Sequence, residues 1–168
     1  MRRVLLTLGL IVISWTVASS QVSYLGRTEL LEEVEICLQH TYGFSFDEAK
    51  RIQSSLSSAT PGHPAPVFLE AMIVYWENFP LLPSKEASEQ FVNLMDKVTE
   101  MANELMKDTL TYTEGVFFDL FGRAFKAMFW ADNGKSGKVI GDLGNMYRDT
   151  KKGFDLKVMT RLMNHYFI

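Results

Sequence analysis

The chain has few residues of three informative kinds. Its 168 residues include one cysteine, five prolines and three histidines. A single cysteine cannot form an internal disulfide, so the fold has to depend on a hydrophobic core, for which the chain is long enough. We expect Cys37 to be packed inside that core as a small apolar group. The alternative is a disulfide to another molecule.

Positive charge is also scarce. The formal net charge is −3, and it falls to about −5 if residues 1–20, which hold two arginines and no acids, are removed. No cluster of lysine and arginine alternates with aromatic residues, which is the usual pattern of a surface that binds phosphate backbones. The sequence therefore argues against a nucleic acid as partner.

Motifs for catalysis and metal binding are missing as well. There is no GxSxG stretch and no HExxH spacing, and His40, His63 and His165 stand in unrelated contexts. Gly134 to Ser136 look like the end of a phosphate loop, but Phe129 stands where that loop needs its first glycine. We predict no catalytic residue, no metal site, no cofactor and no enzymatic activity, and we expect His40 and His63 on the surface or in turns.

The N-terminal residues 1–20 have the pattern of a secretory signal peptide. Arg2 and Arg3 precede an apolar run from Val4 to Ala18, and small residues follow. Cleavage is expected before Gln21 or Ser19. A retained membrane anchor is the alternative, although the run is shorter than the ~20 residues of a spanning helix. We therefore expect a protein that is exported, periplasmic or secreted, without a stable membrane span after cleavage.

Apolar residues recur at helical spacing through the rest of the chain, which predicts an all-α domain over residues 21–168. Pro61 should end one helix, Ser84 should cap another, and Ser45 with Glu48 has the spacing of a capping box. About seven helices are expected, over roughly 30–42, 45–60, 66–79, 84–107, 113–130, 139–152 and 155–166.

Two of these helices are unusually apolar. The helix over 66–79 has a polar edge of only Glu70 and Glu77, so we expect it at the centre of the core. The helix over 113–130 carries six aromatic residues, with Asp119, Arg123 and Lys126 expected on its outer face. Its aromatic residues either fill the later part of the core or line a pocket for an apolar ligand.

The first two hairpins resemble a tetratricopeptide repeat, a helix-turn-helix unit of 34 residues. Cys37 matches the small residue of the first helix, Phe46 and Ala49 match the start of the second, and Pro61 matches the closing proline. Ala71, which stands 34 positions after Cys37, is the counterpart in the next repeat. The resemblance implies antiparallel helical hairpins stacked as a short solenoid.

The resemblance covers about a quarter of the chain. Glu33 and His40 stand where the family has large aromatic residues, and Gln53 replaces a large residue of the second helix. The expected seventh helix also ends the chain without a polar cap. We take this to mean a fragment, a truncated reading frame or a subunit whose last helix docks on another chain.

Tetratricopeptide repeats bind peptides along the surface made by the first helix of each repeat. The corresponding residues in this chain are mostly apolar, so the groove either takes an apolar partner or is filled by later helices of the same chain. The predicted groove residues are Val34, Leu38, Thr41, Phe68, Met72 and Tyr75.

These features favour a non-catalytic scaffold that binds a protein or peptide in the bacterial cell envelope. The alternative is a helical carrier of an apolar small molecule or lipid, which depends on the aromatic residues of the helix over 113–130. The sequence does not identify the partner or the oligomeric state.

Overall fold

The structure is a computed structural model that describes residues 23–24, 27–79, 84–135, 137–140 and 144. Within these residues there is no β-strand, which confirms the all-α prediction. A short helical stretch at 137–140 lies at the start of the expected sixth helix. The rest of that helix and the seventh lie outside the described residues, apart from residue 144. The five longer helices are α1 (Thr28–Tyr42), α2 (Phe46–Ala59), α3 (Pro64–Glu77), α4 (Lys85–Leu105) and α5 (Tyr112–Asp132).

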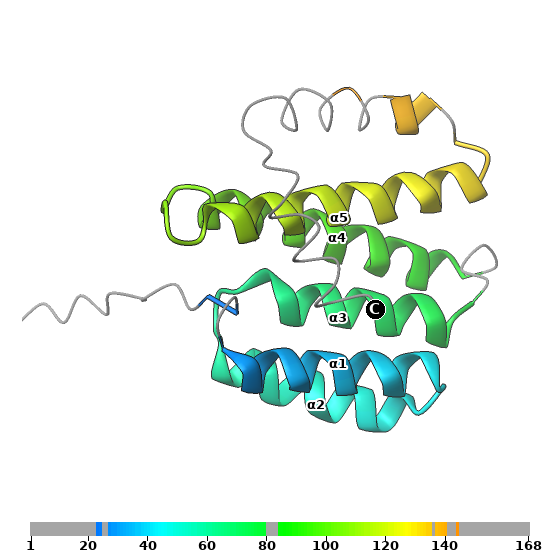
Figure 1. Cartoon of the computed structure of the whole chain (residues 1–168). Helices are drawn as coiled ribbons and strands as arrows, with labels where there is room; N and C mark the ends of the chain where they lie inside the picture. Colours follow the sequence, from blue (N-terminus) through cyan, green and yellow to red (C-terminus); the bar gives the residue numbers. More distant parts are fainter. Residues whose placement is uncertain (1–22, 25–26, 80–83, 136, 141–143, 145–168) are drawn as a thin grey trace, which may run out of the picture.

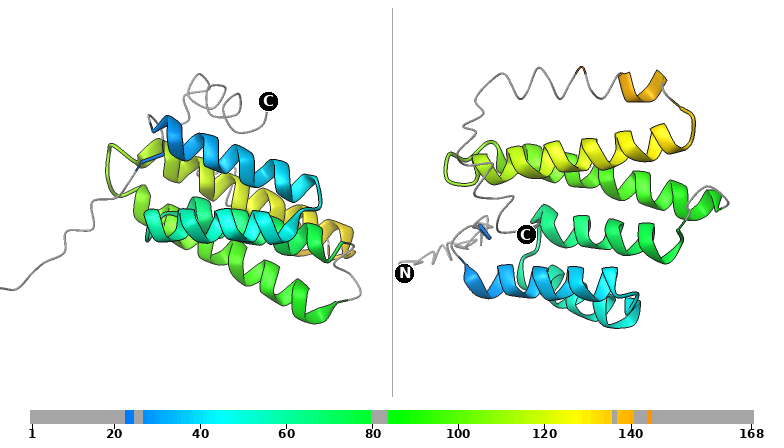
Figure 2. Two further views of the ribbon diagram at one scale, coloured as in Figure 1. Left: turned by 90° about the horizontal axis from the view of Figure 1, so that it is seen from below. Right: turned by 45° about the vertical axis from the view of Figure 1, so that its right-hand side comes forward.

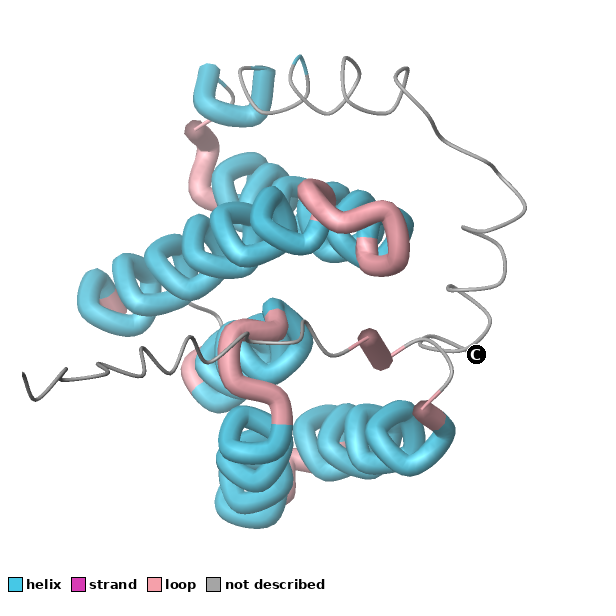
Figure 3. The backbone as a smooth tube through the Cα atoms, turned by 90° about the vertical axis from the view of Figure 1, so that its left-hand side faces the viewer, coloured by secondary structure: helices cyan, strands magenta, loops and turns pink. Residues whose placement is uncertain are grey.

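Consecutive helices pack as antiparallel neighbours (Figure 1). Among the five, α1 also packs on α3, and α3 also packs on α5, whereas α2 and α4 do not touch each other. Figure 3 looks nearly along the helices, and it shows α3 between the α1–α2 pair and the α4–α5 pair. One layer is therefore formed by α1, α3 and α5.

Helix α3 is the centre of the core, as predicted. Pro64 occupies its first turn, where a missing N–H costs nothing, and the His63 side chain accepts a hydrogen bond from the Ala65 N–H. Nearly every residue from Pro64 to Tyr75 is buried. A helix that is apolar on almost all sides has to be covered on almost all sides, and α1, α2, α4 and α5 all contact it.

The helix ends agree with the sequence in part. Helix α2 ends at Ala59, before Pro61, and the Ser84 hydroxyl accepts from the Ala87 N–H at 3.2 Å. The capping box at the start of α2 was wrong, because the Ser45 side chain makes no cap hydrogen bond. The Glu48 carboxylate is instead bound to Arg51, at 2.6 Å and 3.1 Å.

The crossing of α1 and α2 needs small residues. Cys37 and Ala49 are both fully buried, and the Cys37 thiol donates to the Ala49 carbonyl at 3.4 Å. Cys37 is therefore a core residue, as predicted. Gln53, one of the departures from the repeat pattern, donates through its side-chain amide to the Pro66 carbonyl at 3.0 Å. This bond links α2 to the start of α3.

The predicted outer face of α5 was wrong for Asp119, whose exposed fraction is 2%. Both oxygens of its carboxylate accept from the Arg123 Nε–H, at 2.9 Å and 3.0 Å. Lys126 lies across from α4 and donates to Asp96 at 2.6 Å. Because the two carboxylates bind these cations, this side of α5 carries ion pairs rather than freely solvated charges.

Gly115 lets α5 pack closely on α4. A Cβ atom at this position would lie 2.7 Å from the Ala102 carbonyl oxygen and 2.7 Å from the Met106 side chain. We expect Gly115→Ala to lower the free energy of unfolding by up to about 2 kcal/mol. The steric cost, roughly 1–3 kcal/mol, outweighs or offsets the gain of about 1 kcal/mol from the better helix propensity of alanine.

Urea denaturation followed by circular dichroism measures this difference. Gly137→Ala is the matched control, because a Cβ there meets nothing within 4 Å. The control should be neutral or slightly stabilising. A stabilised Gly115→Ala variant would show that α4 and α5 are farther apart than the structure has them.

Candidate functional site

The six predicted groove residues lie on two neighbouring helices, with Val34, Leu38 and Thr41 on α1 and the other three on α3. All six are buried. The Thr41 hydroxyl donates to the Cys37 carbonyl within its own helix, at 2.8 Å. The packing of α1 on α3 thus brings the predicted residues into one interior layer, where a partner could reach them only if part of the chain moved.

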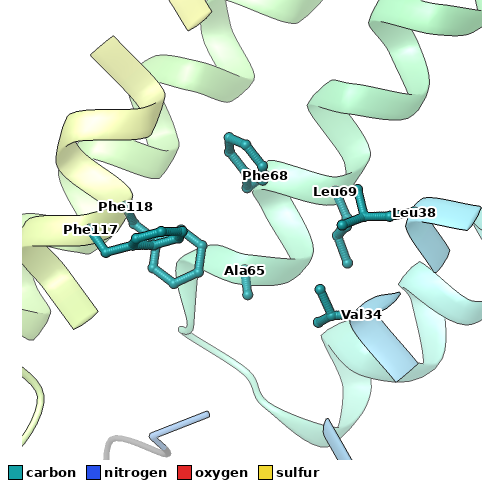
Figure 4. A pocket seen from close by; sticks show the side chains of 7 residues that line it. All are labelled: Val34, Leu38, Ala65, Phe68, Leu69, Phe117 and Phe118. Atoms are coloured by element: carbon teal, nitrogen blue, oxygen red, sulfur yellow. The ribbon is translucent and has the colours of Figure 1, made fainter. Parts of the chain in front are cut away.

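A small cavity lies between α1, α3 and α5 (Figure 4). Its volume is about 20 Å³, enough for roughly one water molecule, and its walls are apolar, so it offers water no hydrogen-bond partners. A lipid does not fit into it in this conformation. The lining residues are Val34, Leu38, Ala65, Phe68, Leu69, Phe117 and Phe118.

The aromatic residues of α5 pack mainly on the core. The Phe68 ring of α3 lies 6.2 Å from Phe118 and 5.5 Å from Phe125, and Phe91 of α4 lies 5.3 Å from Phe129, measured between ring centroids. These edge-on and tilted pairs are the geometries that aromatic rings prefer. Of the two interpretations of this helix, the contacts favour packing.

A cluster of buried polar residues is the feature that the sequence did not predict. It consists of Tyr24, Thr60, His63 and Glu114, with exposed fractions of 0%, 1%, 3% and 1%. Residues 23–24 lie at the end of the bundle where α1, α3 and α5 begin (Figures 1 and 2). His63 was expected on the surface or in a turn. It does stand in the turn before α3, but its side chain is buried.

Tyr24 makes three contacts in this cluster. Its backbone N–H donates to Glu114 Oε1 at 2.9 Å, and its hydroxyl is 2.7 Å from Thr60 Oγ1. Its ring stacks on the His63 imidazole with 4.3 Å between centroids. Tyr24 therefore contacts both the α2–α3 turn and the start of α5.

The hydrogen bonds around His63 assign its proton. Because Nδ1 accepts from the Ala65 N–H at 3.1 Å, the proton of the neutral ring belongs on Nε2. That nitrogen faces Glu114 Oε1 at 3.4 Å, which is long for a hydrogen bond. The second carboxylate oxygen of Glu114, Oε2, is buried and has no hydrogen-bond partner in the part of the chain that the structure describes.

The pKa of the Tyr24 phenol is raised to about 12, chiefly by burial; within that rise the hydrogen bond with Thr60 lowers the pKa and the charge of Glu114 raises it. The unfolded chain has a tyrosine pKa near 10. Above pH 10 the unfolded chain releases a proton that the folded protein keeps. The contribution of Tyr24 to stability is therefore fully present below pH 10 and is lost as the pH rises toward 12. We expect this group to cost roughly 2–3 kcal/mol over that window.

Urea denaturation at pH values from 8 to about 12 tests this expectation in comparison with Tyr24→Phe, since phenylalanine cannot ionise. Burial also raises the pKa of Cys37, Tyr42 and Tyr75, so both proteins should lose stability, the wild type more steeply. If the unfolding free energies of the two proteins fell in parallel with pH, the Tyr24 phenol would be exposed to water in the folded protein.

Burial raises the pKa of the Cys37 thiol to about 11 from its ordinary value of 9.0. The thiolate is the reactive form, and a pKa that is two units higher lowers the thiolate population at a given pH about a hundredfold. We expect the folded protein to react with a chromogenic disulfide reagent at pH 8 at least a hundredfold more slowly than the same protein in 6 M guanidinium. Comparable rates would mean that the thiol is accessible in the folded protein.

The described residues contain no group of three or more histidine, cysteine, aspartate or glutamate side chains that could hold a metal ion. None of the described helices combines the length and the apolar character needed to cross a membrane.

The cluster around Tyr24 holds a carboxylate acceptor, an imidazole and two hydroxyls, and the hydroxyls of Tyr24 and Thr60 bond to each other. The arrangement is suited to holding a polar group.

The cluster could not be found from sequence spacing. Tyr24 and Thr60 are 36 residues apart, and Tyr24 and Glu114 are 90 apart, so no local pattern connects them. The one available signal was His63 directly before Pro64, a position from which a side chain can cap a helix that begins with proline.

When the chain was compared with protein-family models, curated proteins and solved structures, none of the three comparisons gave a match.

Proposed function

We propose that the protein is an exported, non-catalytic scaffold that binds a protein or peptide partner in the bacterial cell envelope. The observation that carries the proposal is a group of aromatic side chains, here called the aromatic end, at the end of the bundle where α1 and α3 finish. It consists of Tyr42, Phe44, Trp76 and Phe79. Exposed apolar groups that lie together are typical of protein-binding surfaces.

The aromatic end is largely exposed, and ring contacts join three of its members, whereas the Phe44 ring contacts Phe46. Phe44 is 65% exposed and Phe79 is 59% exposed. The Trp76 ring packs edge-on against Tyr42 at 5.6 Å and stacks on Phe79 at 5.7 Å. Aromatic side chains such as these supply a large contact area and lose little conformational freedom when they bind.

The aromatic end is also continuous with the predicted groove. The ring of Tyr75, one of the six groove residues, lies 5.8 Å from Phe79 and 5.4 Å from Trp76. A partner that contacts the aromatic end therefore lies next to the layer of α1 and α3. The pattern of helix contacts supports a stacking like that of tetratricopeptide repeats, because α3 packs on both α1 and α5 while α2 and α4 do not contact each other.

Capture from envelope extract tests the proposal. The immobilised protein should retain a partner in a saturable manner, and the double variant Tyr42→Ser with Phe79→Ser should lose that partner. Leu110→Ser is the matched control, because Leu110 is 87% exposed and lies between α4 and α5 at the other end of the bundle. Equal capture by all three proteins, or a measured turnover on a substrate, would contradict the proposal.

The carrier of an apolar small molecule is the second candidate, favoured by the apolar cavity between α1, α3 and α5. Its volume of about 20 Å³ requires the helices to separate before a lipid can enter. Native mass spectrometry of the purified protein distinguishes the two functions. A bound lipid favours the carrier, and an unliganded mass together with capture of a protein favours the scaffold.

A further inference from the structure

The site around Tyr24 has the contacts of a receptor for a tyrosine residue in a peptide. Glu114 accepts the backbone N–H, Thr60 bonds the phenol, and the His63 ring stacks on the tyrosine ring. The site therefore contacts both the side chain and the main chain of one residue. Thr60, His63 and Glu114 are called the tyrosine site below.

Two of the three residues of the tyrosine site, Thr60 and His63, are held in place by contacts that do not involve Tyr24. Thr60 Oγ1 donates to the Leu56 carbonyl at 2.8 Å, and His63 Nδ1 accepts from Ala65 at 3.1 Å. The His63 ring also packs edge-on against Phe118 at 5.4 Å. A receptor whose side chains are already oriented keeps its shape when its ligand leaves.

Tyr24 itself precedes the first helix. Its carbonyl accepts one turn hydrogen bond from the Arg27 N–H at 3.0 Å, and α1 begins at Thr28. Withdrawing Tyr24 from the site therefore breaks no hydrogen bond within a helix. Segments with few such bonds open at a lower free energy than the core does.

The contacts of Tyr24 leave part of the tyrosine site unused. Among the described residues, Glu114 Oε2 and His63 Nε2 are buried without hydrogen-bond partners, although a buried carboxylate oxygen gains from a donor. A ligand that brings an N–H to Oε2 would satisfy it. This buried acceptor points to a ligand independently of the contacts that Tyr24 makes.

We propose that Tyr24 is a displaceable internal ligand, and that the tyrosine site binds a tyrosine-bearing peptide segment from another chain when Tyr24 withdraws. The site lies at the opposite end of the bundle from the aromatic end, so this proposal goes beyond the proposed function and does not depend on it. Ala65 and Phe118 line the apolar cavity and also contact His63, so a ligand side chain next to the tyrosine would reach apolar surface.

The test uses a fluorescein-labelled peptide with the sequence of residues 21–28 and the full chain expressed with its own N-terminal segment. Fluorescence anisotropy should show at least tenfold tighter binding to Tyr24→Ala than to wild type. In wild type the attached Tyr24 competes at an effective concentration that is about millimolar for a short connection. A peptide with alanine in place of its tyrosine is the ligand control.

Glu114→Gln in the Tyr24→Ala background should weaken the binding at least threefold, because the site loses its charged acceptor. A folded Tyr24→Ala variant that binds neither peptide, or both equally, overturns the proposal. Variants of the aromatic end should bind the peptide normally, so failure here is distinguishable from failure of the proposed function.

If Tyr24→Ala does not fold, hydrogen exchange of the wild type decides the question. The Tyr24 amide should exchange at least a hundredfold faster than the amides at the middle of α3, because the segment opens without global unfolding. Exchange of the Tyr24 amide at the rate of the α3 core would overturn the proposal.

Discussion

Replacing Glu114 with alanine is expected to lower the free energy of unfolding by about 3 kcal/mol. The buried Tyr24 N–H loses its acceptor at 2.9 Å, and an unpaired buried donor costs roughly 1–3 kcal/mol. The missing side chain also leaves a void beside His63, whose Nε2 lies 3.4 Å from the carboxylate. Such a void adds the loss of packing contacts to the cost of the unpaired N–H.

Urea denaturation monitored by circular dichroism gives the difference. Glu104→Ala is the matched control, because Glu104 is exposed near the end of α4 and binds Lys107 just after that helix, where a surface ion pair contributes about 0–1 kcal/mol. Glu114→Gln should lose less than Glu114→Ala, since its amide oxygen can still accept from Tyr24. A loss at Glu114 no greater than that at Glu104 would disprove the buried contact.

Phe91→Ala is expected to lower the free energy of unfolding by about 4 kcal/mol, within the roughly 3–5 kcal/mol that phenylalanine truncations cost in cores. Phe91 is fully buried on α4. Its ring lies 5.5 Å from Tyr75 of α3 and 5.3 Å from Phe129 of α5, measured between ring centroids. Truncation therefore leaves a void where three helices meet.

The same denaturation experiment applies to Phe91→Ala, with Phe44→Ala as the control. Phe44 is 65% exposed, so the same chemical change there should alter the stability by no more than about 0.5 kcal/mol. Similar losses at both positions would mean that α4 does not pack between α3 and α5 as described. A change in the denaturant slope would instead indicate a less compact fold.

Local signals in the sequence were sufficient for the helices and most of their ends. Pro61 and Ser84 stand at helix boundaries in the structure, because the effects of proline and of a capping hydroxyl act over one turn of backbone. The capping box at Ser45 failed because the Glu48 carboxylate binds Arg51 on its own helix instead. Competition between local partners of similar strength cannot be read from spacing alone.

The candidate site divides in the same way. The sequence placed Val34 and Leu38 on the same layer as Phe68, and the structure brings α1 and α3 together. The sequence left open whether that layer faces a partner or is filled by the chain itself. Its burial in this structure depends on α5 and on neighbouring side chains, whose positions follow from packing over long sequence distances.

The sequence by itself determined that the chain is helical, that α3 belongs at the centre, and that Cys37 is a packing residue. Each of these follows from periodicity or residue size, which act locally. Only the tertiary structure decided that Tyr24, His63 and Glu114 meet at one end of the bundle. The reason is that buried polar groups are paired by the geometry of packed helices, and residues 90 positions apart share no local signal.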